Sequence, residues 1–282
     1  LKMVCFALIG AIMSLGVNLQ WGFAGLFNIG IMGFVALGGL ATVLVSMPTT
    51  PGAWSEGGWQ ILIGLILGAV TIVGAIFTYR WLPKGRMRNV LMVVLLILGF
   101  MAFRAVFDGG VAGVEAINPA ATGYLGGLNW GGVNYKDLGW LTVVAWPVGG
   151  LLAAGAAWVI GKTALGLRSD YLAIATLGIA EIIIAVMKNE DWLGRGVKNV
   201  VGLPRPVPYE ADLQVDPSFI ERAASLGLDP VTASTLYTKV GYVVLFTIVL
   251  LILLWLAERA LKSPWGRMMR AIRDNEVAAE AM

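Results

Sequence analysis

The sequence predicts an all-α, polytopic membrane protein with about seven membrane-spanning segments. Hydrophobic residues make up 58% of its 282 residues and charged residues only 13%, against about 25% charged residues in a typical soluble domain. The apolar residues form long uncharged runs, and about 20 such residues are enough to cross a bilayer as a helix. The 37 glycines and 11 tryptophans agree with this class, because glycine is common in membrane helices and tryptophan collects at membrane interfaces.

The first apolar run, residues 3–46, is uncharged and too long for one span, so it needs two passes. Its middle, residues 16–30, contains Asn18, Gln20 and Asn28 among four glycines, and we place a break there. Interrupted helices are tolerated where the freed backbone groups face protein or water, and in transporters they mark the binding region. A tight hairpin between two ordinary helices, or a re-entrant segment, explains the same residues.

Five further apolar runs predict single spans, and the loops between them predict the topology. The spans are residues 60–77, 89–107, 140–160, 167–187 and 240–257. Lys and Arg number 11 in the 43 residues of the proposed inner segments (80–88, 161–169 and 258–282) but only 7 in the 96 residues of the outer ones (47–59, 109–139 and 188–239). Because cytoplasmic loops carry the excess of basic residues, we expect a multi-pass membrane protein with residues 258–282 in the cytoplasm. The net charge of +3 therefore reflects topology within membrane lipid, and no nucleic acid is expected as a partner.

The outer segment 188–239 is long enough to hold structure of its own. Two Asp-Pro pairs, which begin at Asp216 and Asp229, each combine an N-cap with a proline in the first helical turn. The first pair predicts a short helix through Leu226, and the second predicts a further helical turn. Residues 202–208 should be extended, because each residue before a proline is pushed out of the α region.

One carboxylate, Glu181, lies inside the otherwise apolar run 167–187. An ionisable group at bilayer depth is costly unless it faces protein or water, so its presence indicates a function. Asp170, Ile174 and Gly178 recur with it at helical spacing and share one face, which we expect to be turned toward other helices. A bond that only holds two helices together is the alternative, since polar side chains also join helices within membranes.

Several kinds of chemistry are excluded by what the sequence lacks. It contains no histidine, which removes histidine acid/base relays, His–metal sites and Ser–His or Cys–His nucleophiles. The single cysteine, Cys5, can form no intrachain disulfide. No G-x-x-x-x-G-K-[ST] sequence occurs, so nucleotide binding by this chain is not supported. We therefore expect no catalytic residue, no metal site and no cofactor.

The last segment, residues 263–282, predicts an amphipathic helix followed by a small alanine-rich one. Ser263 and Pro264 form a strong helix start. Apolar side chains then recur at i, i+3, i+4 and i+7, and arginines occupy the other side. Beyond Asp274, residues 276–282 combine two glutamates with alanines, and such a helix can enter a groove on a partner protein. A basic helix lying on anionic lipid is the alternative.

The tail, GRMMRAIRDNEVAAEAM, resembles the EAA-type coupling segment of ABC transporter permeases, specifically the branched-chain amino acid permeases of the LivM/LivH type. Residues 167–183, LRSDYLAIATLGIAEII, resemble the LivM-like motif that reads roughly LRGDYLAIVTLGFGEII. Residues 200–206, VVGLPRP, resemble the Gly-Ile-Pro-Arg-Pro stretch after it, and residues 18–39 are similar to the Gly-rich early segment of the family. The matches cover roughly a third of the chain and occur in the family's order.

The resemblance implies the transmembrane permease subunit of an ABC importer, with a permease domain over residues 1–262 and a coupling segment over residues 263–282. The solute would be a small polar molecule such as a branched-chain amino acid. The implied partners are cytoplasmic ABC ATPase subunits, a second permease subunit of a different sequence and a periplasmic substrate-binding protein. Because family members continue through further helices beyond Met282, we expect this chain to be incomplete.

The resemblance also assigns candidate site residues to two regions of the chain. The translocation path would be bordered by Asn18, Gln20, Asn28, Asp170, Thr176, Gly178 and Glu181. The segment that couples to the ATPase would include Gly266, Arg270, Arg273, Asp274, Glu276, Ala278, Ala279 and Glu280.

An ion-coupled secondary transporter is the main alternative, in which Glu181 carries a proton between broken helices. The two readings differ in what drives uptake, since one needs ATP and the other needs an ion gradient. An intramembrane enzyme is not favoured, because the sequence offers neither a paired nucleophile nor a metal constellation.

Overall fold

The computed structural model describes residues 1–47, 52–117, 139–164, 166–167, 169–194, 196–197, 200 and 202–274, and all regular structure within them is helical. Within these described residues, six helices are long and apolar enough to cross a membrane. A further apolar helix, α2 (Ile31–Ser46), has 16 residues and is shorter than these six. The predicted all-α polytopic class is confirmed, whereas the number of seven spans is not.

The helices follow the apolar runs of the sequence, with short helices between them. The long ones are α1 (Lys2–Asn18) continued by the π-helix η1 (Leu19–Phe23), the π-helix η2 (Trp54–Gly58) continued by α3 (Trp59–Trp81), α4 (Arg86–Ile117), α5 (Gly139–Ala164), α6 (Ser169–Asn189) and α10 (Pro230–Lys262). The short ones are α7 (Asp191–Gly194), α8 (Glu210–Val215), α9 (Pro217–Ser225) and α11 (Pro264–Asp274). The chain divides into two compact units.

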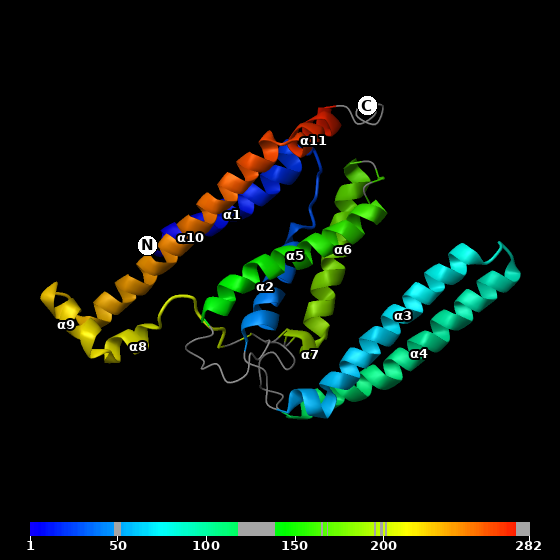
Figure 1. Ribbon diagram of the computed structural model, residues 1–282, viewed down its shortest axis with the longest axis horizontal. Coiled ribbons are helices and arrows are strands. Elements are labelled where there is room, and N and C mark those ends of the chain that lie inside the picture. The colour runs from blue at the N-terminus through cyan, green and yellow to red at the C-terminus, as the bar shows by residue number, and fades with distance from the viewer. Residues whose placement is uncertain are drawn as a thin grey trace. The chain divides into compact units, whose positions relative to one another are not determined.

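The first unit comprises Leu1–Gly39, Leu138–Ile184 and Arg205–Met282. Within it α1 lies along α10, although the two helices stand at opposite ends of the sequence, as Figure 1 shows. Helix α11 continues from α10 and reaches η1 at the end of α1. The N-terminal helix and the last two helices of the described chain therefore pack together.

Helices α8 and α9 pack on the first turns of α10. Gln214 Nε2 donates to Ser234 Oγ at 2.9 Å, and Thr238 Oγ1 donates to the Pro208 carbonyl at 3.3 Å. The Asp216 carboxylate accepts the backbone N–H of Ser218 at 3.0 Å and so caps α9. The helix predicted to follow Asp216 is confirmed. Residues 202–208, which were predicted to be extended, form no helix, but Gly202 has a φ of +80° and residues 206–207 form a bend.

The second unit comprises Leu40–Asp137 and Ala185–Pro204, and its main feature is the antiparallel hairpin of α3 and α4. Glycines let the two backbones approach, since a Cβ on Gly64 would lie 2.9 Å from the Cβ of Phe107. Near the open end of the hairpin, Ala53, Ile61, Phe107 and Val114 form its buried core. The hairpin is thus held by side-chain packing along its length.

Three of the predicted loop boundaries are wrong, because helices extend into the loops. Helix α4 runs to Ile117, into the segment 109–139, and η2 occupies part of the segment 47–59. The glycines in these segments serve close packing: a Cβ on Gly110 would lie 2.9 Å from the Gly57 carbonyl oxygen. Helix α10 begins at Pro230 rather than near residue 240. The rest of the segment 109–139, from residue 118 to 138, lies outside the described residues.

The early start of α10 follows from its capping. The Asp229 carboxylate accepts the backbone N–H groups of Val231 at 3.2 Å and Thr232 at 3.4 Å. Pro230 occupies the first turn, and no helix breaker separates it from the apolar run that follows. The predicted helical turn is therefore the first turn of a 33-residue helix.

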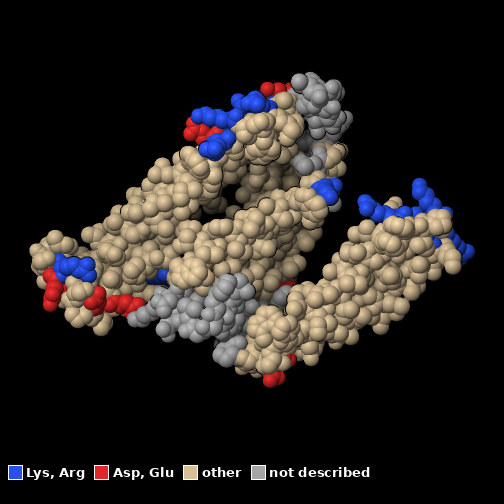
Figure 2. Space-filling model, in the orientation of Figure 1, with Lys and Arg blue, Asp and Glu red and all other residues tan. Residues whose placement is uncertain are grey.

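Charged side chains gather at helix ends in both units. In the hairpin, Figure 2 shows basic side chains around the turn between α3 and α4, where Arg80, Lys84, Arg86 and Arg88 lie, and little charge along the helices. In the first unit, a basic group lies where α10 meets α11. This distribution is the one that a membrane protein needs, because charges then stay clear of the hydrocarbon.

Candidate functional site

The first apolar run is broken where the sequence predicted it. Helix α1 widens into η1, and the chain leaves the helix at Gly25, whose φ of +69° lies in the left-handed region that favours glycine. The Gln20 carbonyl accepts the backbone N–H of Leu26 at 3.0 Å, and the Trp21 carbonyl accepts that of Gly25 at 3.1 Å. Irregular backbone then continues to Gly30, and α2 begins at Ile31.

Two amide side chains of this break bind each other. Asn28 Nδ2 donates to Gln20 Oε1 at 3.0 Å, and Asn28 Oδ1 accepts the backbone N–H of Gly30 at 2.8 Å. Both amide oxygens are engaged, so the amide N–H groups that remain are donors. The pair therefore presents a neutral, donor-rich surface.

Thr176 of α6 holds the end of the break in place. Its Oγ1 accepts the backbone N–H of Ile29 at 3.3 Å and donates to the Ala173 carbonyl at 2.9 Å. Thr176 is buried. At Gly30 the two segments touch, because a Cβ there would overlap the Thr176 carbonyl. The backbone of the break thus contacts the backbone of α6 directly, with no room for a side chain at Gly30.

A cavity of about 470 Å³ opens beside this contact, which lies within the range of about 300–1,000 Å³ for small-molecule pockets. Gln20, Asn28 and Thr176 supply its polar groups, and every side chain that lines it is uncharged. The remaining lining residues are Leu26, Phe34, Gly150, Ala153, Ala154, Ala157, Ile160, Gly161 and Leu172. Three of the predicted path residues therefore meet in one cavity, from two helices and the break.

The wall that α5 contributes was not identified from the sequence. Gly150, Ala153, Ala154, Ala157 and Gly161 recur at helical spacing and form a face of small side chains. The signal was present as small residues at intervals of three and four. In an apolar helix this pattern is also typical of simple helix packing, so it does not by itself indicate a cavity.

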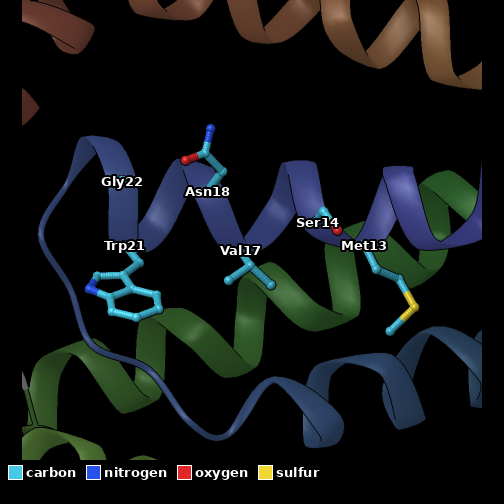
Figure 3. Close-up of a pocket in the computed structure, with 6 residues that line it drawn as sticks. All are labelled: Met13, Ser14, Val17, Asn18, Trp21 and Gly22. Carbon is cyan, nitrogen blue, oxygen red and sulfur yellow. The ribbon is translucent and has the colours of Figure 1, made fainter.

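Asn18 lies outside this cavity. It lines a separate hollow of about 430 Å³ along α1 and η1, together with Met13, Ser14, Val17, Trp21 and Gly22. Figure 3 shows the Asn18 amide on the side of the helix away from Val17 and Trp21. Its oxygen lies over Gly22, where a Cβ would overlap it.

The predicted polar face of α6 is not the face that packs within this chain. Leu172, Ala173, Thr176 and Ala180 of α6 are buried. Gly178 and Glu181 are exposed, and Ile174 is 68% exposed. The side chain of Asp170 lies outside the description of the structure. The structure therefore separates Thr176, which lines the cavity, from the face that carries Glu181.

Helix α11 begins as predicted, because Ser263 Oγ accepts the backbone N–H of Gly266 at 3.4 Å. Two of its exposed arginines bind backbone carbonyls: Arg270 Nη2 donates to the Leu261 carbonyl at 3.3 Å, and Arg273 Nη1 donates to the Gly22 carbonyl at 2.9 Å. Gly266 is buried and Asp274 binds Arg273. The other predicted coupling residues, Glu276, Ala278, Ala279 and Glu280, lie outside the described residues.

The apolar side of α11 is turned outward. Trp265 is 51% exposed and Met268 is 53% exposed, while Ile272 beside them is also exposed. The amphipathic pattern that the sequence predicted is therefore present, with its polar side directed at backbone carbonyls of the same chain. Among the residues that the structure describes, no group of three or more Cys, Asp or Glu side chains could hold a metal ion.

Comparison with known proteins agrees with the resemblance in the motifs. The family described as "Branched-chain amino acid transport system / permease component" matches residues 120–282. The high-affinity branched-chain amino acid transport system permease protein LivM of Escherichia coli (strain K12) is 31% identical over 157 residues, which is 53% of this chain and 35% of that protein. LivM of Salmonella typhimurium (strain LT2) is 27% identical over 232 residues, 79% of this chain and 48% of that protein.

The chain thus spans between about a third and a half of the length of these curated relatives. No solved structure matches it significantly. The family match covers more than half of the chain and includes α5, α6, α10 and α11. This chain belongs to the family of branched-chain amino acid transport permease components.

Proposed function

We propose that this chain is the transmembrane permease subunit of an ABC importer and passes a small solute of the branched-chain amino acid class across a bacterial inner membrane. Family membership carries the proposal. The relatives in two bacteria are named as permease proteins of a high-affinity branched-chain amino acid transport system. ATP is hydrolysed by separate cytoplasmic subunits, and a second permease and a periplasmic binding protein complete the transporter.

The cavity at the break supports this function by its chemistry. The amide N–H groups of Gln20 and Asn28 suit a carboxylate, and Leu26, Phe34 and Leu172 offer apolar surface to an aliphatic side chain. The lining holds no charge that would trap a zwitterion. Weak binding is what a transport path needs, because a solute that binds too well does not leave. Asn18, Asp170, Gly178 and Glu181 border the rest of the path.

The cytoplasmic end of the chain couples the permease to its ATPase. Gly266, Arg270 and Arg273 fix the base of the segment against α10 and η1. Beyond Asp274, the alanine-rich sequence with Glu276 and Glu280 is the part proposed to enter a groove of the ATPase. Closure of the ATPase then displaces this helix as a rigid body.

Reconstitution of the full-length protein with its partners in proteoliposomes tests the proposal. Uptake of radiolabelled leucine should require ATP on the ATPase side and the binding protein on the other, and should survive an uncoupler. Inhibition of leucine uptake by valine, by an acidic amino acid and by urea then ranks these solutes as substrates. Uptake that collapses with the uncoupler and survives loss of ATP would identify an ion-coupled transporter instead.

Glu181 gives a second test of the path. Glu181→Gln removes the negative charge with little change of shape, and we expect an assembled complex with reduced uptake. Glu56→Gln, which changes an exposed carboxylate in η2, is the matched control. Uptake by Glu181→Gln equal to that of the control would assign Glu181 to helix packing.

The coupling segment gives a third test. Ala278→Arg with Ala279→Arg places bulk and charge on the proposed small helix, so ATP hydrolysis should continue while uptake stops. Ala271→Arg changes an exposed alanine of α11 and serves as the control. An unchanged ratio of solute taken up to ATP hydrolysed would remove this account of the segment.

A further inference from the structure

One hydrogen bond joins the cytoplasmic helix to the first membrane helix across 251 positions of sequence. Arg273 Nη1 donates to the Gly22 carbonyl at 2.9 Å. Arg273 Nε and Nη2 both donate to Asp274 Oδ1, at 3.0 and 2.9 Å. Asp274 therefore holds one edge of the Arg273 guanidinium, and the remaining N–H group, on Nη1, is directed at the break. Charge-assisted bonds are stronger than neutral ones, although water screens this pair, whose side chains are 40% and 66% exposed.

The Gly22 carbonyl is one of the acceptors that the end of a helix leaves without a partner. The two carbonyls before it are satisfied by the backbone, since Gln20 accepts from Leu26 and Trp21 accepts from Gly25. Arg273 supplies the donor for the third. The break is thus closed partly by its own chain and partly by α11.

The backbone of the break also fits the arginine stem. Gly25 has a φ of +69°, and a Cβ there would lie 2.8 Å from Arg273 Cγ and 3.5 Å from Arg273 Cα. Close approach and backbone conformation both require glycine at this position. The other arginines of α11 do not share this contact. The Arg270 side chain donates to the carbonyls of Gly266 and Leu261, and the Arg267 side chain is exposed.

The same turn leads directly into the cavity. Gln20 precedes Gly22 by two residues and lines the cavity with its side chain, and Leu26 follows Gly25 and lines it too. Gln20 and Leu26 are joined by a backbone hydrogen bond, and Gln20 binds Asn28. A shift of Gly22 is thus carried to the polar wall through short, bonded segments.

We propose that Arg273 is a positioning residue that ties the ATPase-facing segment to the wall of the cavity. Displacement of α11 moves Gly22 and, through it, Gln20 and Asn28. The tie acts beside α10, which is the covalent route from α11 into the membrane. This inference rests on the proposed function, since it gives the coupling segment a specific target within the path.

The test compares arginines of the same helix in the reconstituted transporter. Arg273→Ala should keep ATP hydrolysis by the complex and lower the solute taken up per ATP about tenfold, from the loss of a charge-assisted bond. Arg273→Lys keeps one donor and loses the paired bonds to Asp274, so an intermediate ratio is expected. Arg267→Ala removes a charge of the same helix and should leave the ratio at the wild-type value.

A second readout follows the cavity wall itself. In a Cys5→Ser, Leu26→Cys background, the rate of thiol labelling at position 26 should change when ATP binds. Arg273→Ala should abolish that change, and Arg267→Ala should retain it. If Arg273 only stabilised the fold, the labelling rate would still change on ATP binding in Arg273→Ala.

The outcomes separate the two proposals. No ATP-dependent uptake by the wild-type transporter would reject the proposed function. Wild-type uptake with an unchanged ratio and unchanged labelling in Arg273→Ala would reject only the tie. If Arg273→Ala yields no complex, Arg273→Lys decides by the same two measurements, and wild-type values for it overturn the inference.

Discussion

The break of the first unit and the hairpin of the second are both built from apolar, glycine-containing sequence, yet they use glycine in opposite ways. In the hairpin, Gly64 lets α3 pack on Phe107 of α4, and both helices stay regular. In the break, Gly25 ends a helix and Gly30 lets irregular backbone touch α6. The difference lies in the neighbours, since amides accompany the glycines of the break and apolar side chains accompany those of the hairpin.

The comparison shows what distinguishes the candidate site from the rest of this chain. Irregular backbone at membrane depth needs polar partners, and the break finds them in Gln20, Asn28 and Thr176. Those partners also form the cavity. The hairpin needs none of them, and its glycines serve packing alone. Substitutions in the two regions should therefore fail in different ways.

The largest effect is expected at Gly30. In Gly30→Ala the added Cβ would overlap the Thr176 carbonyl, and overpacking of this kind costs about 1–3 kcal/mol. Because the backbone of the break and α6 must separate, we expect uptake to be lost. Gly38→Ala is the control, since nothing lies within 4 Å of its Cβ position. Equal uptake by the two variants would mean that the contact is not part of the path.

The next effect is expected in the hairpin. In Gly64→Ala the Cβ would lie 2.9 Å from the Cβ of Phe107 and 3.1 Å from its Cα. The free energy of unfolding should therefore fall by about 1–3 kcal/mol, which a lower midpoint of thermal unfolding in detergent would report. Gly74→Ala meets only Leu95 methyl groups at 3.7 Å and should be tolerated. Uptake per folded complex should stay unchanged in both variants. Loss of uptake in folded Gly64→Ala would mean that the hairpin, like the break, takes part in transport.

A smaller effect is expected at Thr176. Thr176→Val keeps the shape and leaves the Ile29 N–H without its acceptor, at a cost of about 1–2 kcal/mol. Thr71→Val in the hairpin removes only a bond to the Leu67 carbonyl of the same helix. Hydrogen exchange at Ile29 should rise in the first variant alone. Unchanged exchange there would show that the hydroxyl does not hold the break.

The smallest effect is expected for an exposed ion pair in the second half of α4. Arg104 Nε and Asp108 Oδ2 lie 2.9 Å apart, with side chains 54% and 49% exposed. An exposed pair of this spacing contributes about 0.3–0.5 kcal/mol. Arg104→Ala should therefore leave uptake unchanged and barely alter thermal unfolding. A large loss of uptake would give the pair a part in transport.

The sequence predicted those features that local chemistry decides. Asp216 and Ser263 mark helix starts because an N-cap followed by proline has few other uses. The break was located because amides and glycines interrupt an uncharged run. The end of α4 was missed because glycines that serve packing, as at Gly110, look like loop glycines in sequence. The start of α10 was missed because its first turns, residues 230–239, are polar and precede the apolar run.

The site was predicted in part for a related reason. Periodicity tells which residues share a helical face, and it grouped Gly178 with Glu181 correctly. It does not tell what covers that face, and in this chain the buried face of α6 is the one with Thr176. The tie between Arg273 and Gly22 spans almost the whole sequence, so no local pattern could report it.

The short helix α2 has a consequence for the surrounding lipid. Its 16 residues rise about 24 Å, less than the roughly 30 Å of hydrocarbon in an ordinary bilayer. A bilayer accommodates a short apolar helix by thinning around it, at a modest cost per ångström of mismatch. We therefore expect the acyl-chain length of the host lipid to affect transport. Vesicles of shorter-chain lipids should sustain faster turnover than vesicles of longer-chain ones.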